Sequence, residues 1–251
     1  MPARKVRNKV RLDAALVERG LAASRERARA LIMAGHVSVN DQKVSKAGTA
    51  VADDAQIEVA EPDHPYVGRG GVKLAHALDA FAIDPSGKRA LDVGASTGGF
   101  TDVLLRRGAA GVIALDVGRA QLDWRIRSDA RVTVVEGVNA RSLTAADVPS
   151  PVDLVVIDVS FISLGHIFPA LPPFLAPGAD IVALVKPQFE AGREQVGKRG
   201  IVSDPAVHAE VLERVTAQAA AAGLRRVAMV PSAITGATGN QEFFIHLKLR
   251  S

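Results

Sequence analysis

Apolar runs alternate with amphipathic stretches through the larger, C-terminal part of the chain. The amphipathic or alanine-rich stretches include 100–107 and 206–222, which have the length and spacing of helices. The strand-like runs are Ala90–Val93, Gly111–Asp116, Val132–Glu136, Leu154–Ile157, Ile181–Val185, Arg226–Val230 and Phe243–Leu249. Alternation of this kind is typical of a doubly wound sheet with helices on both faces. The pattern therefore predicts a Rossmann-like α/β domain.

The N-terminal part of the chain has a different pattern, with two short helices followed by short strands. Ser24 can cap the second helix and Gly35 can end it. Alternation at 37–39 and 57–59 predicts strands, and Asn40 with Asp41 offers a tight turn after the first of them. A small α+β domain is expected here.

A polar stretch marked by prolines separates these two patterns. It contains Pro62, Asp63, His64 and Pro65, a composition that suits a linker better than a helix or strand. We therefore place the small domain at 1–61, the linker at 62–68 and the large domain at 69–251.

Basic residues gather near the N-terminus. The 251 residues carry a formal net charge of +4, and 1–11 contains five basic residues and no acidic one. Clustered cations predict a surface for nucleic-acid phosphates, with a solvated tail and helix-surface charges as the alternative. Arg25 and Arg29 are four residues apart and share a helix face. The candidate contacts are Arg4, Lys5, Arg7, Arg11, Arg25, Arg29, Lys43, Lys46 and Arg69.

Residues 91–101 have the pattern of a buried strand, a glycine turn and the start of a helix, where a cofactor can approach bare backbone. The spacing is not the G-x-G-x-x-G of dinucleotide sites. Asp92 beside the turn would repel a pyrophosphate but attract a cationic cofactor such as S-adenosylmethionine. The candidate cofactor contacts in this segment are Asp92, Gly94, Ala95, Ser96, Thr97, Gly98, Gly99 and Phe100.

Further candidate cofactor contacts follow the next two predicted strands. Asp116 ends the strand after the turn, where a carboxylate can accept hydrogen bonds from both hydroxyls of a ribose. Val117, Glu136 and Asn139 lie at the edge where an adenine would bind. For Asp92 and Asp116 the alternative is a carboxylate that caps a nearby helix, and for Glu136 and Asn139 it is an ordinary strand-to-helix turn.

Four charged residues lie at predicted strand ends or on the helix that enters the large domain. Asp158 and Lys186 each follow an unbroken apolar run, and the carboxyl ends of parallel strands line the ligand crevice. Glu242 joins them if its strand runs antiparallel, and Lys73 if its helix leans over the same edge. A lysine acts as a base only when burial or a second cation lowers its pKa. The four residues predict a catalytic group, with structural ion pairs as the alternative.

The chain resembles the hemolysin A-type family of ribosomal RNA 2′-O-ribose methyltransferases, in which an S4-like RNA-binding domain precedes an FtsJ-type methyltransferase domain. The matching segments are Arg11–Asp13, Ser24–Arg25, Gly35–Asn40, Arg69–Leu74, Asp92–Thr101, Asp158–Ser163, Lys186–Glu190 and Gly239–Phe244. The resemblance implies S-adenosylmethionine as the cofactor and a catalytic tetrad of Lys73, Asp158, Lys186 and Glu242, with Lys186 as the base. The implied substrate is a cytidine of ribosomal RNA, in the large subunit and, as an open second target, in the small subunit.

Two positions depart from the family pattern, although neither belongs to the tetrad. Gly68 stands where the family commonly has serine, and Asp41 stands where the turn commonly has glycine. The chain also ends soon after its last predicted strand. Some relatives carry a longer C-terminal extension, and its absence leans towards a large-subunit target.

The composition of the chain narrows the classes of protein to which it can belong. The chain has no cysteine, which excludes disulfides and thiolate chemistry. It shows no run of the roughly 20 apolar residues that span a membrane, no signal-peptide pattern and no metal-site spacing. We expect a cytoplasmic monomer that acts on ribosomal RNA or ribosomal subunits without metal or membrane. The alternatives are a catalytically silent assembly factor, a nicotinamide-dependent oxidoreductase and a membrane-active hemolysin.

Overall fold

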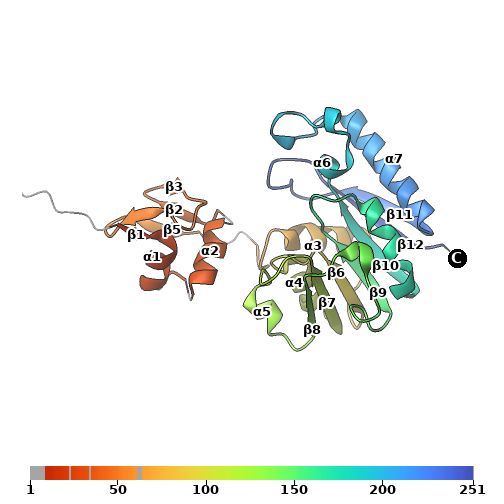
Figure 1. The fold of residues 1–251 in the computed structure, drawn as a ribbon, viewed down its shortest axis with the longest axis horizontal. Coiled ribbons are helices and arrows are strands. Elements are labelled where there is room, and N and C mark those ends of the chain that lie inside the picture. The colour runs from red at the N-terminus through yellow and green to blue at the C-terminus, as the bar shows by residue number, and fades with distance from the viewer. Residues whose placement is uncertain (1–8, 23, 34, 61–63, 251) are drawn as a thin grey trace, which may run out of the picture. The chain divides into compact units, whose positions relative to one another are not determined.

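The structure is a computed structural model that describes residues 9–22, 24–33, 35–60 and 64–250. Contacts divide the chain into two compact units, Met1–Pro65 and Tyr66–Ser251 (Figure 1). Three of the predicted phosphate contacts, Arg4, Lys5 and Arg7, lie outside the described residues.

The N-terminal unit is a small α+β fold with a core of its own. Leu12, Leu16 and Ile32 are fully buried in that core. β1 pairs with β4, and β2 lies between β3 and β5, with every pair antiparallel. The elements are β1 (Lys9–Arg11), α1 (Leu12–Glu18), α2 (Arg25–Met33), β2 (Val37–Val39), β3 (Gln42–Lys43), β4 (Ala50–Ala52) and β5 (Ile57–Val59).

Local signals explain several features of this unit. Ser24 Oγ accepts a hydrogen bond from Arg27 N at 3.1 Å, which is the expected cap of α2. Asn40 and Asp41 have φ values of 48° and 64°, the two positive angles that a type I′ hairpin turn requires between β2 and β3. The pairing of β1 with β4 is not predicted, because a three-residue basic strand is too short to show alternation.

The C-terminal unit is built on a sheet that has seven strands in the part of the chain that the structure describes. The strand order is β11-β12-β10-β9-β6-β7-β8. β12 runs antiparallel to β10 and β11, and the remaining neighbours run parallel. The strands are β6 (Arg89–Val93), β7 (Gly111–Asp116), β8 (Val132–Glu136), β9 (Val152–Ile157), β10 (Leu175–Val185), β11 (Leu224–Pro231) and β12 (Phe243–Leu249).

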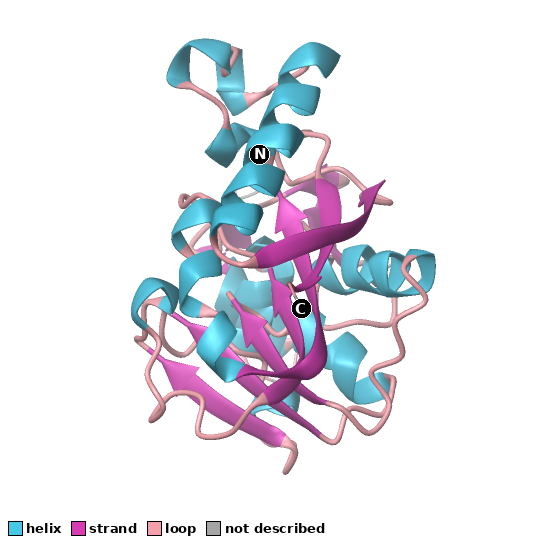
Figure 2. Ribbon diagram, turned by 90° about the vertical axis from the view of Figure 1, so that its right-hand side faces the viewer, coloured by secondary structure: helices cyan, strands magenta, loops and turns pink. Residues whose placement is uncertain are grey.

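Helices cover both faces of this sheet (Figure 2). The α-helices are α3 (Gly70–Ala80), α4 (Gly99–Arg106), α5 (Trp124–Arg127), α6 (Pro187–Glu190) and α7 (Pro205–Ala221). The 3-10 helices are η1 (Ala140–Ser142), η2 (Leu164–His166), η3 (Phe168–Ala170), η4 (Pro172–Phe174), η5 (Arg193–Gln195) and η6 (Lys198–Gly200). Prolines at 169, 172 and 173 keep the connection from β9 to β10 in short 3-10 turns.

Successive residues of the central strands face two separate cores. Ala90 and Val156 pack on the face that α3 and α4 cover, with Leu74 and Leu104. The residues next to them along the strands pack on the opposite face, with α7 and the 3-10 helices η2 and η3. Both faces are therefore buried, as the unbroken apolar runs predict for parallel strands.

No helix in the described ranges is long and apolar enough to cross a membrane. Within those same ranges, no group of three or more histidine and carboxylate side chains is placed to hold a metal ion.

Candidate active site

The glycine turn joins β6 to α4 at the carboxyl edge of the sheet. Gly94 has a φ of 86°, and a Cβ atom there would overlap the carbonyl oxygen of Asp158 at the end of β9. Gly98 begins α4 with a φ of 94°, a left-handed conformation that favours glycine. Gly94 lets the turn lie directly against the end of β9, whereas Gly98 lies against Leu122 and Ile126.

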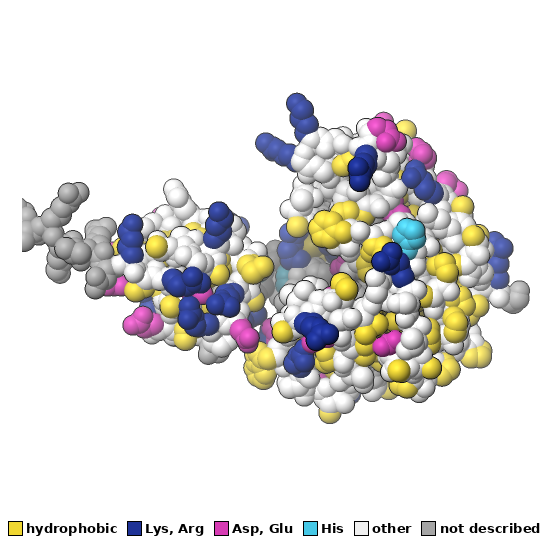
Figure 3. All heavy atoms as spheres, viewed as in Figure 1, with side chains coloured by type: hydrophobic (Ala, Val, Ile, Leu, Met, Phe, Trp, Pro, Cys, Tyr) yellow, Lys and Arg dark blue, Asp and Glu magenta, His cyan; other side chains and the backbone are white. Residues whose placement is uncertain are grey.

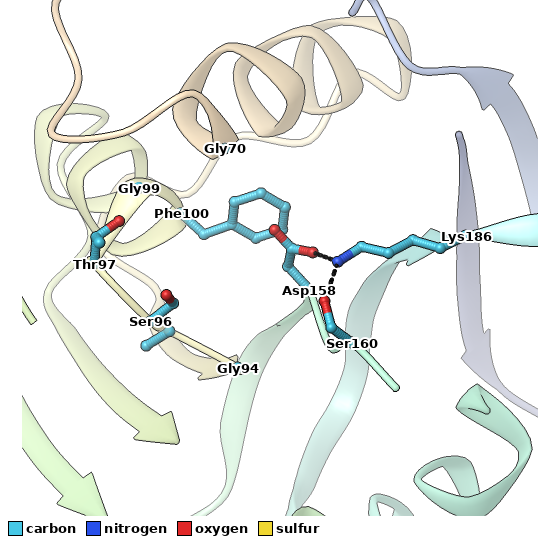
Figure 4. A pocket seen from close by; sticks show the side chains of 10 residues that line it. Gly70, Gly94, Ser96, Thr97, Gly99, Phe100, Asp158, Ser160 and Lys186 are labelled. Atoms are coloured by element: carbon cyan, nitrogen blue, oxygen red, sulfur yellow. Dashed lines mark hydrogen bonds and ion pairs between the residues drawn. The ribbon is translucent and has the colours of Figure 1, made fainter. Parts of the chain in front are cut away.

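A cavity of about 180 Å³ lies over this turn (Figure 4). Its wall combines backbone from the turn and the start of α4 with side chains from the ends of β9 and β10. The lining residues are Gly70, Gly94, Ala95, Ser96, Thr97, Gly99, Phe100, Asp158, Ser160 and Lys186. The predicted contact Gly98 does not line the cavity, because a Cβ there would point towards Leu122 and Ile126.

Asp92 lies beneath the turn rather than in the cavity wall. Its side chain is fully buried, and its Oδ2 accepts a hydrogen bond from Thr101 Oγ1 at 2.6 Å. Among the described residues, no group donates to Asp92 Oδ1. Burial raises the pKa of Asp92 to about 7. Asp92 is not among the residues that line the cavity, and its expected attraction to a cationic cofactor stays a prediction.

Asp116 ends β7 beside the turn and holds two loops in place. Its Oδ2 accepts a hydrogen bond from Ser96 N at 2.8 Å, and its Oδ1 accepts one from Gly118 N at 2.7 Å. Ser96 and Gly118 lie in loops outside the helices, so these bonds hold loop backbone and do not cap a helix. Each carboxylate oxygen has two lone pairs, so the bonds do not exhaust its capacity to accept ribose hydroxyls.

The remaining predicted cofactor contacts continue along the same edge. Glu136 lies beside Asp116 in the pairing of β7 with β8. Its carboxylate accepts from Ala120 N at 3.0 Å and from Arg127, whose guanidinium holds the pKa of Glu136 below its ordinary value. Asn139 Oδ1 caps η1, and the side chain of Val117 is exposed. Over the described residues, the cavity lining does not include these side chains.

Two of the four predicted catalytic residues meet in the cavity wall. Lys186 Nζ lies 2.7 Å from Asp158 Oδ1 and donates to Ser160 Oγ at 2.9 Å (Figure 4). The side chain of Lys186 is 11% exposed and that of Asp158 is 24% exposed. This ion pair can meet a molecule that enters the cavity.

The other two predicted catalytic residues form a second, more buried ion pair. Lys73 on α3 contacts Glu242, and their side chains are 11% and 3% exposed. β12 runs antiparallel to β10 with Phe243 opposite Val185, so Glu242 lies at the same edge of the sheet as Lys186. Gly236 leaves room for Glu242, because a Cβ there would overlap its carboxylate. The tetrad residues thus form two ion pairs at one edge.

Two residues at the site were not singled out in the sequence. Ser160 binds Lys186, and a serine three residues past a strand end carries no special signal. Phe161 has a ring centroid 4.9 Å from that of Phe189, yet its own side chain is 90% exposed. From sequence alone, a phenylalanine that follows an apolar strand is expected to lie in the core. The structure shows instead that the Phe161 side chain faces solvent.

The predicted phosphate contacts divide between the two units. Arg11, Arg25 and Arg29 converge on Asp13 in the N-terminal unit. Lys43 and Lys46 are exposed in the same unit. Arg69 is exposed at the start of α3, where its Nη2 donates to the carbonyl oxygen of Thr235 at 3.3 Å.

Comparison with known proteins identifies relatives of both units. The model of the FtsJ-like methyltransferase family matches residues 66–249, and the S4 domain model matches residues 10–57. The "Putative rRNA methyltransferase YqxC" of Bacillus subtilis is 50% identical over 95% of this chain and 85% of that protein. The "16S/23S rRNA (cytidine-2'-O)-methyltransferase TlyA" of Mycobacterium tuberculosis is 48% identical over 97% of this chain and 91% of that protein.

A solved structure is also similar to this chain. The "Putative hemolysin from Streptococcus thermophilus" is 43% identical, with a TM-score of 0.75. The match covers 97% of this chain and 89% of that one.

Proposed function

The chain belongs to the FtsJ-like methyltransferase family, and from this premise we propose that it transfers a methyl group from S-adenosylmethionine to the 2′-hydroxyl of a cytidine in ribosomal RNA. One observation carries the proposal: the glycine turn and the Lys186–Asp158 pair line the same cavity. The names of these relatives and the match to the S4 domain support ribosomal RNA as the substrate. The name of the Mycobacterium tuberculosis relative covers both subunits, so we keep 23S RNA as the first target and 16S RNA as a second.

The residues of the cavity suit such a cofactor. S-adenosylmethionine, when bound, would supply a methyl group on a sulfonium, from which a neutral thioether leaves readily. Gly94, Ala95 and Gly99 leave backbone bare at the cavity, and Asp158 adds a carboxylate to its wall. The nucleoside part would extend along the edge formed by the ends of β7 and β8, where Asp116 and the exposed Val117 lie.

Lys186 has the position of the proton acceptor in this proposal. In its neutral form, Nζ accepts the proton of the ribose 2′-hydroxyl, while Asp158 Oδ1 and Ser160 Oγ fix the nitrogen at the cavity wall. Lys73 and Glu242 lie in a buried pair at the same edge and hold the surrounding elements. Most of the rate gain comes from holding the hydroxyl in line with the methyl group.

Mapping of ribose methylation on ribosomal RNA, with and without the gene, tests the proposal. We expect one or a few cytidines to lose their 2′-O-methyl group in the deletion strain. The wild-type gene should restore the modification, whereas the Lys186→Ala gene should not. A catalytically silent assembly factor predicts a subunit defect with unchanged methylation, and that outcome would overturn the proposal.

A further inference from the structure

A buried aspartate lies at the centre of the basic surface of the N-terminal unit. Asp13, in the first turn of α1, is fully buried. Arg11 on β1 binds both of its oxygens, with Nε to Oδ1 at 3.0 Å and Nη2 to Oδ2 at 2.9 Å. From α2, Arg25 Nη2 lies 3.2 Å from Oδ1 and Arg29 Nε lies 3.3 Å from Oδ2. One carboxylate thus gathers arginines from two separate elements.

The arginines stay accessible although they share a buried partner. Each of the three side chains is slightly more than half exposed, at 52%, 53% and 52% for Arg11, Arg25 and Arg29. A guanidinium has five N–H donors in a planar fork, so one edge can bind Asp13 while another binds a phosphate. The cluster keeps a net charge of +2, since three cations share one anion. Figure 3 shows basic side chains gathered where α1 and α2 lie.

We propose that Asp13 is a positioning residue that holds Arg11, Arg25 and Arg29 as one preformed clamp for RNA phosphates. The inference rests on the proposed RNA substrate and deepens it. Long side chains lose rotamer freedom when they bind, and a clamp held by Asp13 has lost much of that freedom in advance. The bonds from Arg11 hold the pKa of Asp13 well below its usual range, so the carboxylate remains an anion at any working pH.

Charge alone and positioning predict opposite effects of removing the carboxylate. Asp13→Asn raises the net charge of the surface, so a purely Coulombic effect would tighten RNA binding. Loss of positioning would weaken it, because the arginines would then have to be ordered by the RNA itself. Glu26→Gln is the matched control, since it removes an exposed carboxylate from α2 on the same unit.

A binding experiment separates the Coulombic effect from the positioning effect. The full-length protein is titrated with purified 23S ribosomal RNA, without cofactor and over a series of salt concentrations. We expect Asp13→Asn to weaken binding at least tenfold and to flatten the plot of log affinity against log salt. Glu26→Gln should leave the affinity unchanged or slightly higher. A folded Asp13→Asn protein that binds as tightly as the wild type, or more tightly, would overturn the proposal.

A second variant decides the question if Asp13→Asn unfolds the small unit. The triple variant Arg11→Lys, Arg25→Lys, Arg29→Lys preserves the charge, but a lysine cannot bind a carboxylate and a phosphate through two edges of one planar group. We expect this triple variant to bind at least tenfold more weakly, and wild-type affinity would contradict the clamp. Failure of the wild-type protein itself to bind ribosomal RNA would instead contradict the proposed function.

Discussion

The two ion pairs of the candidate site have the same chemistry but different surroundings. Asp158 keeps 24% of its side chain exposed and, with Lys186, lines the cavity beside the glycine turn. Glu242 is only 3% exposed and binds Lys73 from α3. An ion pair that borders a cavity can exchange partners with a substrate, whereas a buried pair mainly fixes the elements that carry it. We therefore propose proton transfer for the Lys186–Asp158 pair and structural support for the Lys73–Glu242 pair.

The largest expected effect is on the rate of methyl transfer when Lys186 is removed. Lys186→Ala should lower the single-turnover rate by about 10³-fold, within the usual range for loss of a general base. S-adenosylmethionine binding should change only a few-fold, because the turn backbone remains. Lys198→Ala, at an exposed lysine of η6, is the control and should keep the wild-type rate. A near-wild-type rate for Lys186→Ala would show that the pair at the cavity does not carry out proton transfer.

The loss of stability should be larger for the buried Lys73–Glu242 pair than for the Lys186–Asp158 pair at the cavity. Glu242→Gln leaves the ammonium of Lys73 buried without its anion, which should lower the free energy of unfolding by about 3–5 kcal/mol. Asp158→Asn should cost less than half as much, since solvent reaches that pair. Urea denaturation of both variants checks the difference. Equal losses of unfolding free energy in the two variants would show that burial does not make one ion pair more important for stability than the other.

Asp92 shows how a buried carboxylate at this edge behaves without a lysine beside it. Its pKa is raised from 3.8 to about 7, so the folded protein keeps the proton that the unfolded chain releases above pH 4. This group therefore destabilises the fold progressively between about pH 4 and pH 7, by at most about 4 kcal/mol. Asp92→Asn should remove that part of the pH dependence and raise the melting temperature at pH 8. An unchanged dependence in thermal unfolding would show that Asp92 ionises normally.

The smallest expected effect belongs to Ser160. Ser160→Ala removes one hydrogen bond to Lys186 Nζ but leaves Asp158 in place. We expect a threefold to tenfold slower methyl transfer, in line with the roughly 1 kcal/mol of a single hydrogen bond. The melting temperature should stay within about 2 °C. Steady-state kinetics and thermal unfolding of the same preparation provide the check, and a full loss of activity would give Ser160 a greater role than a support for Lys186.

The sequence predicted the architecture well because the apolar runs, the amphipathic stretches and the residues that end each element are all local features of the chain. Apolar runs and strand ends placed Asp158, Lys186 and Glu242 at one edge, provided that the last strand ran antiparallel, as it does. The residues of the turn that line the cavity followed from glycine spacing in the same way.

The burial of charged groups could not be predicted from the local sequence around them. The sequence did not reveal that Asp92 is fully buried and accepts a hydrogen bond from Thr101. The contact of Arg11, Arg25 and Arg29 with Asp13 joins segments whose distances in space depend on the whole small fold. Contacts of this kind follow from tertiary packing, which residue spacing alone does not determine.

The most direct test of the account is the chemical identity of the methylated nucleoside. Purified protein, S-adenosylmethionine with a labelled methyl group and ribosomal subunits lacking the modification would be incubated together, and the RNA would then be digested to nucleosides for mass spectrometry. The account predicts label in 2′-O-methylcytidine with the wild-type protein and none above background with Lys186→Ala. Label on a base, or no label in RNA from either subunit, would contradict it.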